Sequence, residues 1–180
     1  MPSELADEAI ALRVPCQDDV AAMVEAVRSS LDDLMRWTSW CHADYEAEDA
    51  VKFLRRVDSE RFEDRAYDYF IADATQSRLL GGCGLYHVDR TTGCASLGYW
   101  VRRDAAGRGH ATRAARLLVR FGLVDLDLTR IEILVATENL ASQRVAEKIG
   151  ATREGVLRNR LVLKGRPTDA VVFSLIPADL

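Results

Sequence analysis

The first third of the chain shows helical periodicity after one short apolar run. Residues 9–14 are predicted to form a strand that Pro15 ends. Apolar side chains spaced three and four residues apart then predict a helix that starts near residues 17–19. Residues 31–40 are expected to be a short helical or irregular piece, and residues 47–62 a charged amphipathic helix. The chain therefore opens with one strand followed by helices.

The pattern changes to a period of two in the middle of the chain. Residues 67–72 are predicted to form a strand, and residues 79–88 and 94–101 a hairpin around Arg90-Thr-Thr-Gly93. Helical and strand patterns then alternate. They predict, in order, a helix at 109–123, a strand at 131–136, a helix at 139–149 and a final hairpin of 156–163 and 169–176.

These connections indicate the fold class. A helical crossover joins the strands at 94–101 and 131–136, so those two strands are expected to run parallel. The remaining pairs are hairpins and are expected to be antiparallel. The sequence thus predicts an α/β layered fold: a mixed, mostly antiparallel seven-stranded sheet with one central parallel strand pair and helices on both faces.

Length and composition are those of an ordinary globular protein. With 180 residues, 48% hydrophobic and 29% charged, the chain is expected to form one domain over residues 1–180. No apolar run approaches the ~18 residues of a membrane span, and the acidic N-terminus does not resemble a signal peptide. The four cysteines show no CxxC or Cys/His clustering, which predicts reduced thiols and no metal. We therefore expect a cytoplasmic protein with no membrane partner.

The charge is distributed unevenly along the chain. The net charge of −4 argues against general nucleic-acid binding. Residues 101–170 hold 14 Lys and Arg against 8 Asp and Glu, whereas the remainder holds 10 against 20. A polyanionic cofactor would suit the basic part and a cationic acceptor the acidic part. Solvated helix faces of different sign would give the same counts.

The most specific signal is a predicted strand that enters a helix through small residues. The strand ends at Arg102 and Arg103, and the turn Ala106-Gly-Arg-Gly-His-Ala111 precedes the helix. Small residues let the main chain approach a ligand closely, and the N–H groups at a helix start bind anions. With Arg102, Arg103 and Arg108 nearby, the segment predicts a diphosphate site. Taken alone, it is explained as well by a turn that needs glycines.

A second segment points to the same chemistry. Asn139-Leu-Ala-Ser142 opens a helix that Lys148-Ile-Gly150 closes, and Glu-Gly-Val-Leu-Arg follows at residues 154–158. Together with the run from Gly107 to Thr112, these segments resemble the GNAT superfamily of N-acetyltransferases, and within it the RimJ/RimL-like branch, which acetylates protein N-termini. Ala106 stands where the superfamily pattern has Gln or Arg.

The resemblance implies acetyl-CoA as the cosubstrate and direct transfer of its acetyl group to an amine. Backbone N–H groups near Leu97-Gly98 would stabilise the oxyanion. The pantetheine arm would lie between two splayed strands, along the edge formed by Trp100, Val101 and Arg102. The other residues that the resemblance assigns to the cofactor are Ala106, Gly107, Arg108, Gly109, His110, Ala111, Thr112, Asn139 and Ser142.

The thiol leaving group has one candidate donor. Many GNAT enzymes offer a Tyr seven residues after the Asn, where this chain has Ala146. The resemblance instead implies that Ser142 donates a hydrogen bond to the departing sulfur. Alternatively, Ser142 only satisfies N–H groups at the start of its helix.

The general base is not evident from the sequence. Ser96 and Leu161 occupy positions where relatives carry carboxylates. Glu132 remains a weak base candidate, with Asp89 and His87 behind it. Because an α-amine has a pKa of ~7.7–8.0 and a lysine amine ~10.4, a missing base favours an α-amine acceptor.

The acceptor site is the least defined part. The segment Leu34-Met-Arg-Trp37-Thr-Ser-Trp40 resembles one that relatives place beside the acceptor. Trp40 and Tyr99 are the candidate acceptor-binding residues, with core packing as the alternative for Trp40; Trp37 is expected in the core, and His42 and Tyr45 are undecided. The leading expectation is an N-terminal acetyltransferase. A small-molecule amine acetyltransferase, a non-catalytic acyl-CoA-binding domain and a homodimer stay open.

Overall fold

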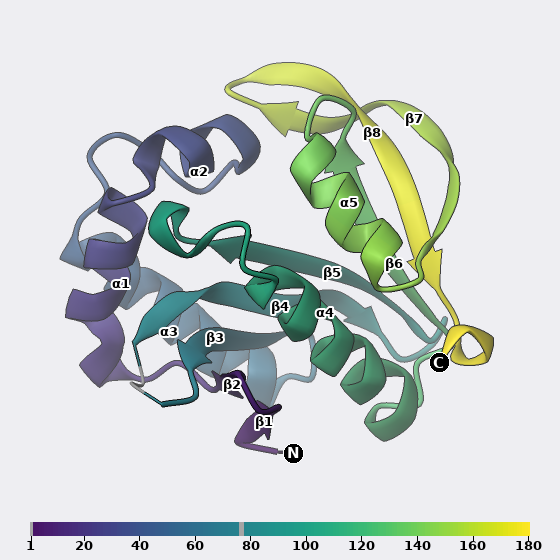
Figure 1. Cartoon of the computed structure of the whole chain (residues 1–180), viewed down its shortest axis with the longest axis horizontal. Helices are drawn as coiled ribbons and strands as arrows, with labels where there is room; N and C mark the ends of the chain where they lie inside the picture. The colour runs from purple at the N-terminus through teal and green to yellow at the C-terminus, as the bar shows by residue number, and fades with distance from the viewer. Residues whose placement is uncertain (1, 76–77) are drawn as a thin grey trace.

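The computed structural model describes residues 2–75 and 78–180, and in these ranges it shows one eight-stranded sheet of order β1-β2-β3-β4-β5-β6-β8-β7 (Figure 1). Each neighbouring pair is antiparallel except β5 with β6. The strands are β1 (Glu4–Ala6), β2 (Ile10–Arg13), β3 (Tyr67–Asp73), β4 (Leu79–Asp89), β5 (Cys94–Val101), β6 (Arg130–Ala136), β7 (Thr152–Leu163) and β8 (Arg166–Leu175).

Helices cover both faces of this sheet. In Figure 1, α4 and α5 lie in front of the sheet and α3 lies behind it. The mixed sheet, its single parallel pair and the two helical layers confirm the predicted fold class. The α-helices of the described residues are α1 (Val20–Arg28), α2 (Leu31–Trp37), α3 (Ala47–Phe62), α4 (His110–Arg120) and α5 (Leu140–Lys148).

The predicted count of seven strands is wrong by one. The additional strand, β1, has three residues and pairs antiparallel with β2, with Leu5 opposite Leu12. A segment this short shows no alternation of apolar and polar positions, so its sequence carries no strand signal. The predicted helix at 109–123 is α4, and it continues into a π-helical turn over Phe121–Asp125.

Two groups of buried side chains hold the helical layers to the sheet. On one face, Leu118 of α4 and Ala146 of α5 pack in the cluster that contains Ile133. On the other, Leu54 of α3 packs in the cluster that contains Phe70 of β3. Alternate strand residues point to opposite faces, so β3 contributes Tyr69 to the first cluster and Phe70 to the second. Each fully buried aliphatic side chain contributes roughly 1.5–3 kcal/mol to stability.

Strands β5 and β6 separate soon after they pair. Their parallel register contains three pairs and ends at Ser96 opposite Glu132. β5 runs on to Val101 and β6 to Ala136, each held on its outer side, by β4 and β8 respectively. Since α4 follows β5 and α5 follows β6 along the chain, both helices begin near the open end of this split.

An ion pair joins β2 to the start of α1. The guanidinium of Arg13 donates to both carboxylate oxygens of Asp19 at 2.5 and 2.7 Å, and the backbone N–H of Cys16 donates to Oδ2 at 2.8 Å. Burial would raise the pKa of Asp19, but the Arg13 and Cys16 hydrogen bonds outweigh burial and lower it.

We expect Asp19→Asn to lower the free energy of unfolding at pH 7 by roughly 1–3 kcal/mol. The native pKa of Asp19 is below the unfolded value, so its carboxylate stabilises the fold above an unfolded pKa of ~3.9 and this contribution is lost as pH falls through the native pKa. Urea unfolding of both proteins at pH 7 and at about pH 2.5 measures the difference. Equal destabilisation at the two pH values contradicts this account.

Candidate active site

A cavity of about 1380 Å³ lies at the split between β5 and β6 and is lined from both faces of the sheet. On the α4 and α5 face, the lining comes from the turn before α4 and from the first turn of α5. On the opposite face, it comes from α2, α3 and the segment between them, together with β3 and β4. The lining of the α4 and α5 face includes Gly107, Gly109, His110, Asn139 and Ser142. The lining of the opposite face includes Trp40, Tyr45, Asp68, Tyr86 and Trp100.

The glycine turn has the backbone that an anion site requires. Gly107 has φ +77° and Gly109, the N-cap of α4, has φ +84°, both in the left-handed region. A Cβ built on either glycine would meet no atom within 4 Å, so these glycines are not required by crowding within the protein. The first backbone bond of α4 runs from the N–H of Arg113 to the carbonyl of Gly109 at 3.0 Å. The first-turn N–H groups before Arg113 therefore have no carbonyl partner within the helix.

His110 adds an unpartnered group beside this turn. Its Nδ1 is buried and has no hydrogen-bond partner among the described residues, and the residue lines the cavity. Burial and the neighbouring Arg108 lower the pKa of His110, which favours the neutral imidazole. The open turn, the orphaned nitrogen and the exposed Arg108 fit a polyanionic ligand such as the diphosphate of coenzyme A.

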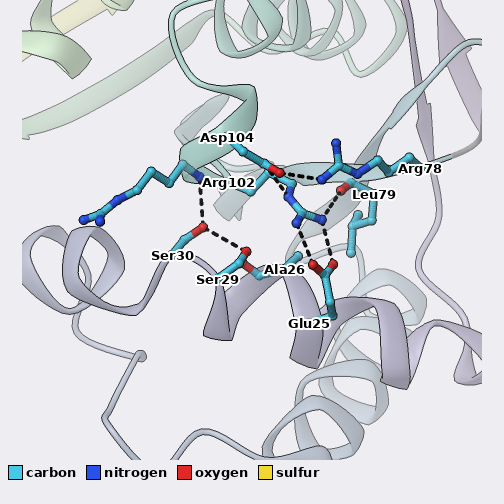
Figure 2. Close-up of polar contacts among 9 residues, drawn as sticks. Glu25, Ala26, Ser29, Ser30, Arg78, Leu79, Arg102 and Asp104 are labelled. Carbon is cyan, nitrogen blue, oxygen red and sulfur yellow. Dashed lines mark hydrogen bonds and ion pairs between the residues drawn. The ribbon is translucent and has the colours of Figure 1, made fainter.

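The expectation that the Arg102 guanidinium supplies charge to the phosphates is corrected by the structure. Figure 2 shows this side chain directed at Glu25 of α1, to which it donates at 2.6 and 2.7 Å, and at Asp104, to which it donates at 2.7 Å. Only 4% of the side chain is exposed. Arg103 is also engaged, at 2.7 Å from Asp33. Glu25 lies 77 residues from Arg102 in the sequence, so only the fold reveals this pairing.

Asn139, Ser142 and Tyr99 form a hydrogen-bonded group on the α5 side. Asn139 caps α5, since its Oδ1 accepts from the N–H of Ser142 at 3.1 Å. The Tyr99 phenol lies 3.0 Å from the Ser142 carbonyl and 3.0 Å from Ser142 Oγ, and its one proton is donated to one of these oxygens at a time; donation to Oγ leaves the serine proton free. Burial raises the pKa of Tyr99 to about 12, so the phenol stays protonated. Asn139, rather than Ser142, satisfies the helix start, which leaves the Ser142 hydroxyl available.

Two expected positions differ in the structure. Tyr99, expected beside the acceptor with Trp40, lies instead beside Ser142, on the same face as the glycine turn. Glu132 does not line the cavity; its carboxylate accepts from Arg130 at 2.9 Å at the closed end of the split. The geometry therefore gives no support to Glu132 as a base.

The two remaining base candidates differ in their positions. Asp89 accepts from Thr91 and Thr92 in the β4–β5 turn and lies outside the cavity lining. His87 lines the cavity and has φ +51°. No carboxylate among the described residues that line the cavity belongs to β5 or β6, the two strands that form the split.

Aromatic side chains line the α2 and α3 side. Trp40 is 42% exposed, and its ring centroid lies 6.0 Å from that of Trp100 and 6.1 Å from that of Tyr45. Trp40 is thus in the cavity wall, and its place beside the acceptor stays a prediction. Trp37, expected in the core, is half-buried at the cavity under the guanidinium of Arg36.

Sequence reasoning missed Asp68 and Tyr86. Asp68 lies in β3 with a side chain 3% exposed, and the Tyr86 phenol donates to its Oδ1 at 2.8 Å. Burial raises the pKa of both groups. The available signal was a single carboxylate within an apolar strand, but its partner became identifiable only through the β3–β4 register.

Three further observations concern metal binding, membrane-spanning helices and the cysteines. Within residues 2–75 and 78–180, no cluster of three His, Cys, Asp or Glu side chains could hold a metal ion. No helix of the described chain is both long and apolar enough to cross a membrane. The four cysteines carry free thiols.

Comparisons with known proteins find acetyltransferases. The family model described as "Acetyltransferase (GNAT) domain" matches residues 10–152. The chain is 31% identical over 156 residues to "Probable N-acetyltransferase YjcK" of Bacillus subtilis (strain 168), covering 85% of this chain and 86% of that protein. It is 35% identical over 98 residues to "Putative ribosomal N-acetyltransferase YdaF" of the same organism, or 54% of each chain.

A solved structure agrees over nearly the whole chain. The protein described as "a putative ribosomal-protein-serine acetyltransferase from Vibrio cholerae" has a TM-score of 0.84 and 28% identity, covering 98% of this chain and 100% of that chain. The fold, the split strands and these matches define an acetyl-CoA-dependent N-acetyltransferase. The chain belongs to the GNAT acetyltransferase family, and its relatives include proteins named for ribosomal-protein acetylation. These findings do not favour the non-catalytic alternative.

Proposed function

We propose that this enzyme acetylates the N-terminal α-amine of a protein or peptide. The observation that carries the proposal is the absence of a carboxylate on β5 or β6 among the described residues of the cavity wall. Without a carboxylate base on the two strands of the split, an acceptor that is already partly neutral is favoured. An α-amine with a pKa of ~7.7–8.0 is partly neutral at pH 7, whereas a lysine amine at ~10.4 is almost wholly charged. The relatives named for ribosomal-protein acetylation support the same choice.

The turn and the split would position the cosubstrate. The first-turn amides of α4, with the Gly107 to Thr112 backbone, would hold the diphosphate through charge-assisted hydrogen bonds. The backbone of β5 at Trp100 and Val101, and Arg102 directly after it, lie beyond the last pair with β6, so the free edge there can pair with the pantetheine amides. Asn139 would face the same arm. These contacts would aim the thioester into the split.

The transfer itself needs few groups. The neutral amine attacks the thioester carbon, the C–N bond forms and the C–S bond breaks. Backbone N–H groups of β5 near Leu97 and Gly98 would stabilise the oxyanion. Ser142, positioned by Tyr99, would donate a hydrogen bond to the departing sulfur. Because a thiol has a pKa of ~8.5, this modest help is sufficient, and the amine's surplus proton leaves on the thiol.

A competition between amine types tests the proposal. Three acceptors are compared at pH 7.5: a peptide with a free α-amine and methylated lysines, the same peptide blocked at its N-terminus with free lysines, and a linear polyamine. We expect mass spectrometry to place the acetyl group on the α-amine, with a kcat/KM at least about tenfold above the lysine peptide. Higher kcat/KM for the polyamine would instead identify a small-molecule acetyltransferase.

A further inference from the structure

The α2 and α3 side of the cavity contains buried polar atoms that the proposed transfer does not use. In the described residues, four buried side-chain atoms lack a hydrogen-bond partner, and three of these belong to cavity-lining residues. One is Nδ1 of His110 beside the glycine turn. The other two, Oδ2 of Asp68 and the hydroxyl of Tyr45, lie on the opposite face. Buried polar groups are rarely left without partners, so this concentration indicates a ligand site.

The surroundings of Asp68 leave one of its oxygens open to a donor. Tyr86 occupies Oδ1, whereas the nearest cation, Arg56 Nη2, lies 3.6 Å from Oδ2 without a hydrogen bond. Arg56 is held elsewhere: it donates to Glu60 at 2.6 Å and lies 5.2 Å over the ring of Phe53. Arg56 therefore offsets part of the Asp68 charge but leaves room for another cation to hydrogen-bond to Oδ2.

The sheet register places Asp68 at a distance from the reacting centre. Asp68 is paired with Gly84 of β4, and Gly84 with Gly98 of β5. Two strand spacings of ~4.8 Å put Asp68 roughly 10 Å from Gly98 across the sheet. The Tyr86 ring fills the space between, since a Cβ on Gly84 or Gly98 would lie 2.7 or 3.0 Å from it. Asp68 is thus too remote to take the proton of an amine at the split.

We propose that Asp68 and Tyr45 bind a second, cationic group of the acceptor, roughly 10 Å from the amine that is acetylated. This inference rests on the proposed function and specifies its substrate class. Trp40 and Trp100, whose rings lie 6.0 Å apart, form an aromatic wall that attracts a cation. Suitable acceptors are peptides with Lys or Arg as the second or third residue, given ~3.3–3.6 Å per extended residue.

Matched acceptors test the inference. Two peptides differ only in having lysine or norleucine at the second residue, and a second pair differs in the same way at the third. We expect the wild type to favour one of the lysine peptides by about tenfold or more in kcat/KM. The Asp68→Asn variant should bring that ratio close to one, because loss of the charge slows only the cationic member of each pair. Which pair shows the effect identifies the source of the cation.

Three controls separate the site from general damage. Asp19→Asn removes another buried, arginine-paired carboxylate, which lies outside the cavity lining, and should keep the wild-type preference. Tyr45→Phe keeps the ring and should lower the preference for the cationic acceptor severalfold. This variant replaces Asp68→Asn as the test if Asp68→Asn does not fold. The acetyl-CoA Kd should be the same in all variants.

These experiments distinguish a failure of the cation-binding inference from a failure of the proposed function. A wild type that acetylates these amines without regard to the second charge overturns this inference alone. So does an equal loss for both members of a pair in Asp68→Asn. Absence of acetyl transfer to every amine tested overturns the proposed function, and this inference with it.

Discussion

Gly109→Glu is expected to raise the Kd for acetyl-CoA by at least about 100-fold, since at least two charge-assisted hydrogen bonds of roughly 1.5–3 kcal/mol each would be lost. The new side chain would enter the open space over the first turn of α4, where it would both fill the anion site and repel the phosphates. Isothermal titration calorimetry gives the Kd, and circular dichroism confirms that the fold persists.

Gly150 offers a matched control for this substitution. It has φ +90°, a Cβ there would also meet nothing within 4 Å, and it lies outside the cavity lining. Gly150→Glu therefore introduces the same charge and a similar backbone strain of roughly 1–2 kcal/mol. Its acetyl-CoA Kd should equal that of the wild type. Equal weakening in both variants would mean that strain or net charge, rather than a phosphate site, explains the Gly109 result.

Ser142→Ala is expected to lower kcat by roughly 10–100-fold, the value of one hydrogen bond to a charged leaving group. The KM for acetyl-CoA should change by less than about threefold, because the hydroxyl is assigned to the sulfur in the transition state rather than to cofactor binding. Steady-state kinetics at saturating acceptor, followed by thiol release, measures both constants.

Tyr99→Phe distinguishes a direct role of Ser142 from a structural one. This substitution removes the phenol that holds Ser142 Oγ at 3.0 Å but leaves the hydroxyl in place. We expect kcat to fall severalfold, and the double variant to be no slower than Ser142→Ala alone, because both changes act through one hydrogen bond. Additive losses would mean that Tyr99 acts independently of Ser142, and an unaltered kcat in Ser142→Ala would remove Ser142 from the mechanism.

The layered fold and much of the cofactor side could be predicted because their signals are local. The period-two and helical patterns predicted strands at 94–101 and 131–136, which are β5 and β6, and the helix between them, and the crossover predicted that those strands run parallel. The glycine turn is also local, since positive φ at Gly107 and Gly109 is a property of the residues themselves. The three-residue strand β1 was too short to give such a signal.

The rest of the site depends on contacts between distant residues. Arg102 was expected to face the phosphates, but its preference for Glu25, 77 residues away, could not be read from either segment. The Tyr99 side chain points to the face opposite those of its neighbours Gly98 and Trp100. Only the packing of α5 on that face brings Ser142 next to Tyr99. The role proposed for Asp68 depends on the strand register, which places this residue two strands from Gly98. Side-chain partners of this kind follow from the fold and not from the local pattern.

A crystal structure of the enzyme with coenzyme A tests the central claim most directly. The account predicts the diphosphate on the main-chain amides between Gly107 and Thr112, and the pantetheine arm along β5 with its sulfur in the split beside Ser142. Electron density for the cofactor at another surface, with the turn before α4 free of phosphate, would contradict it.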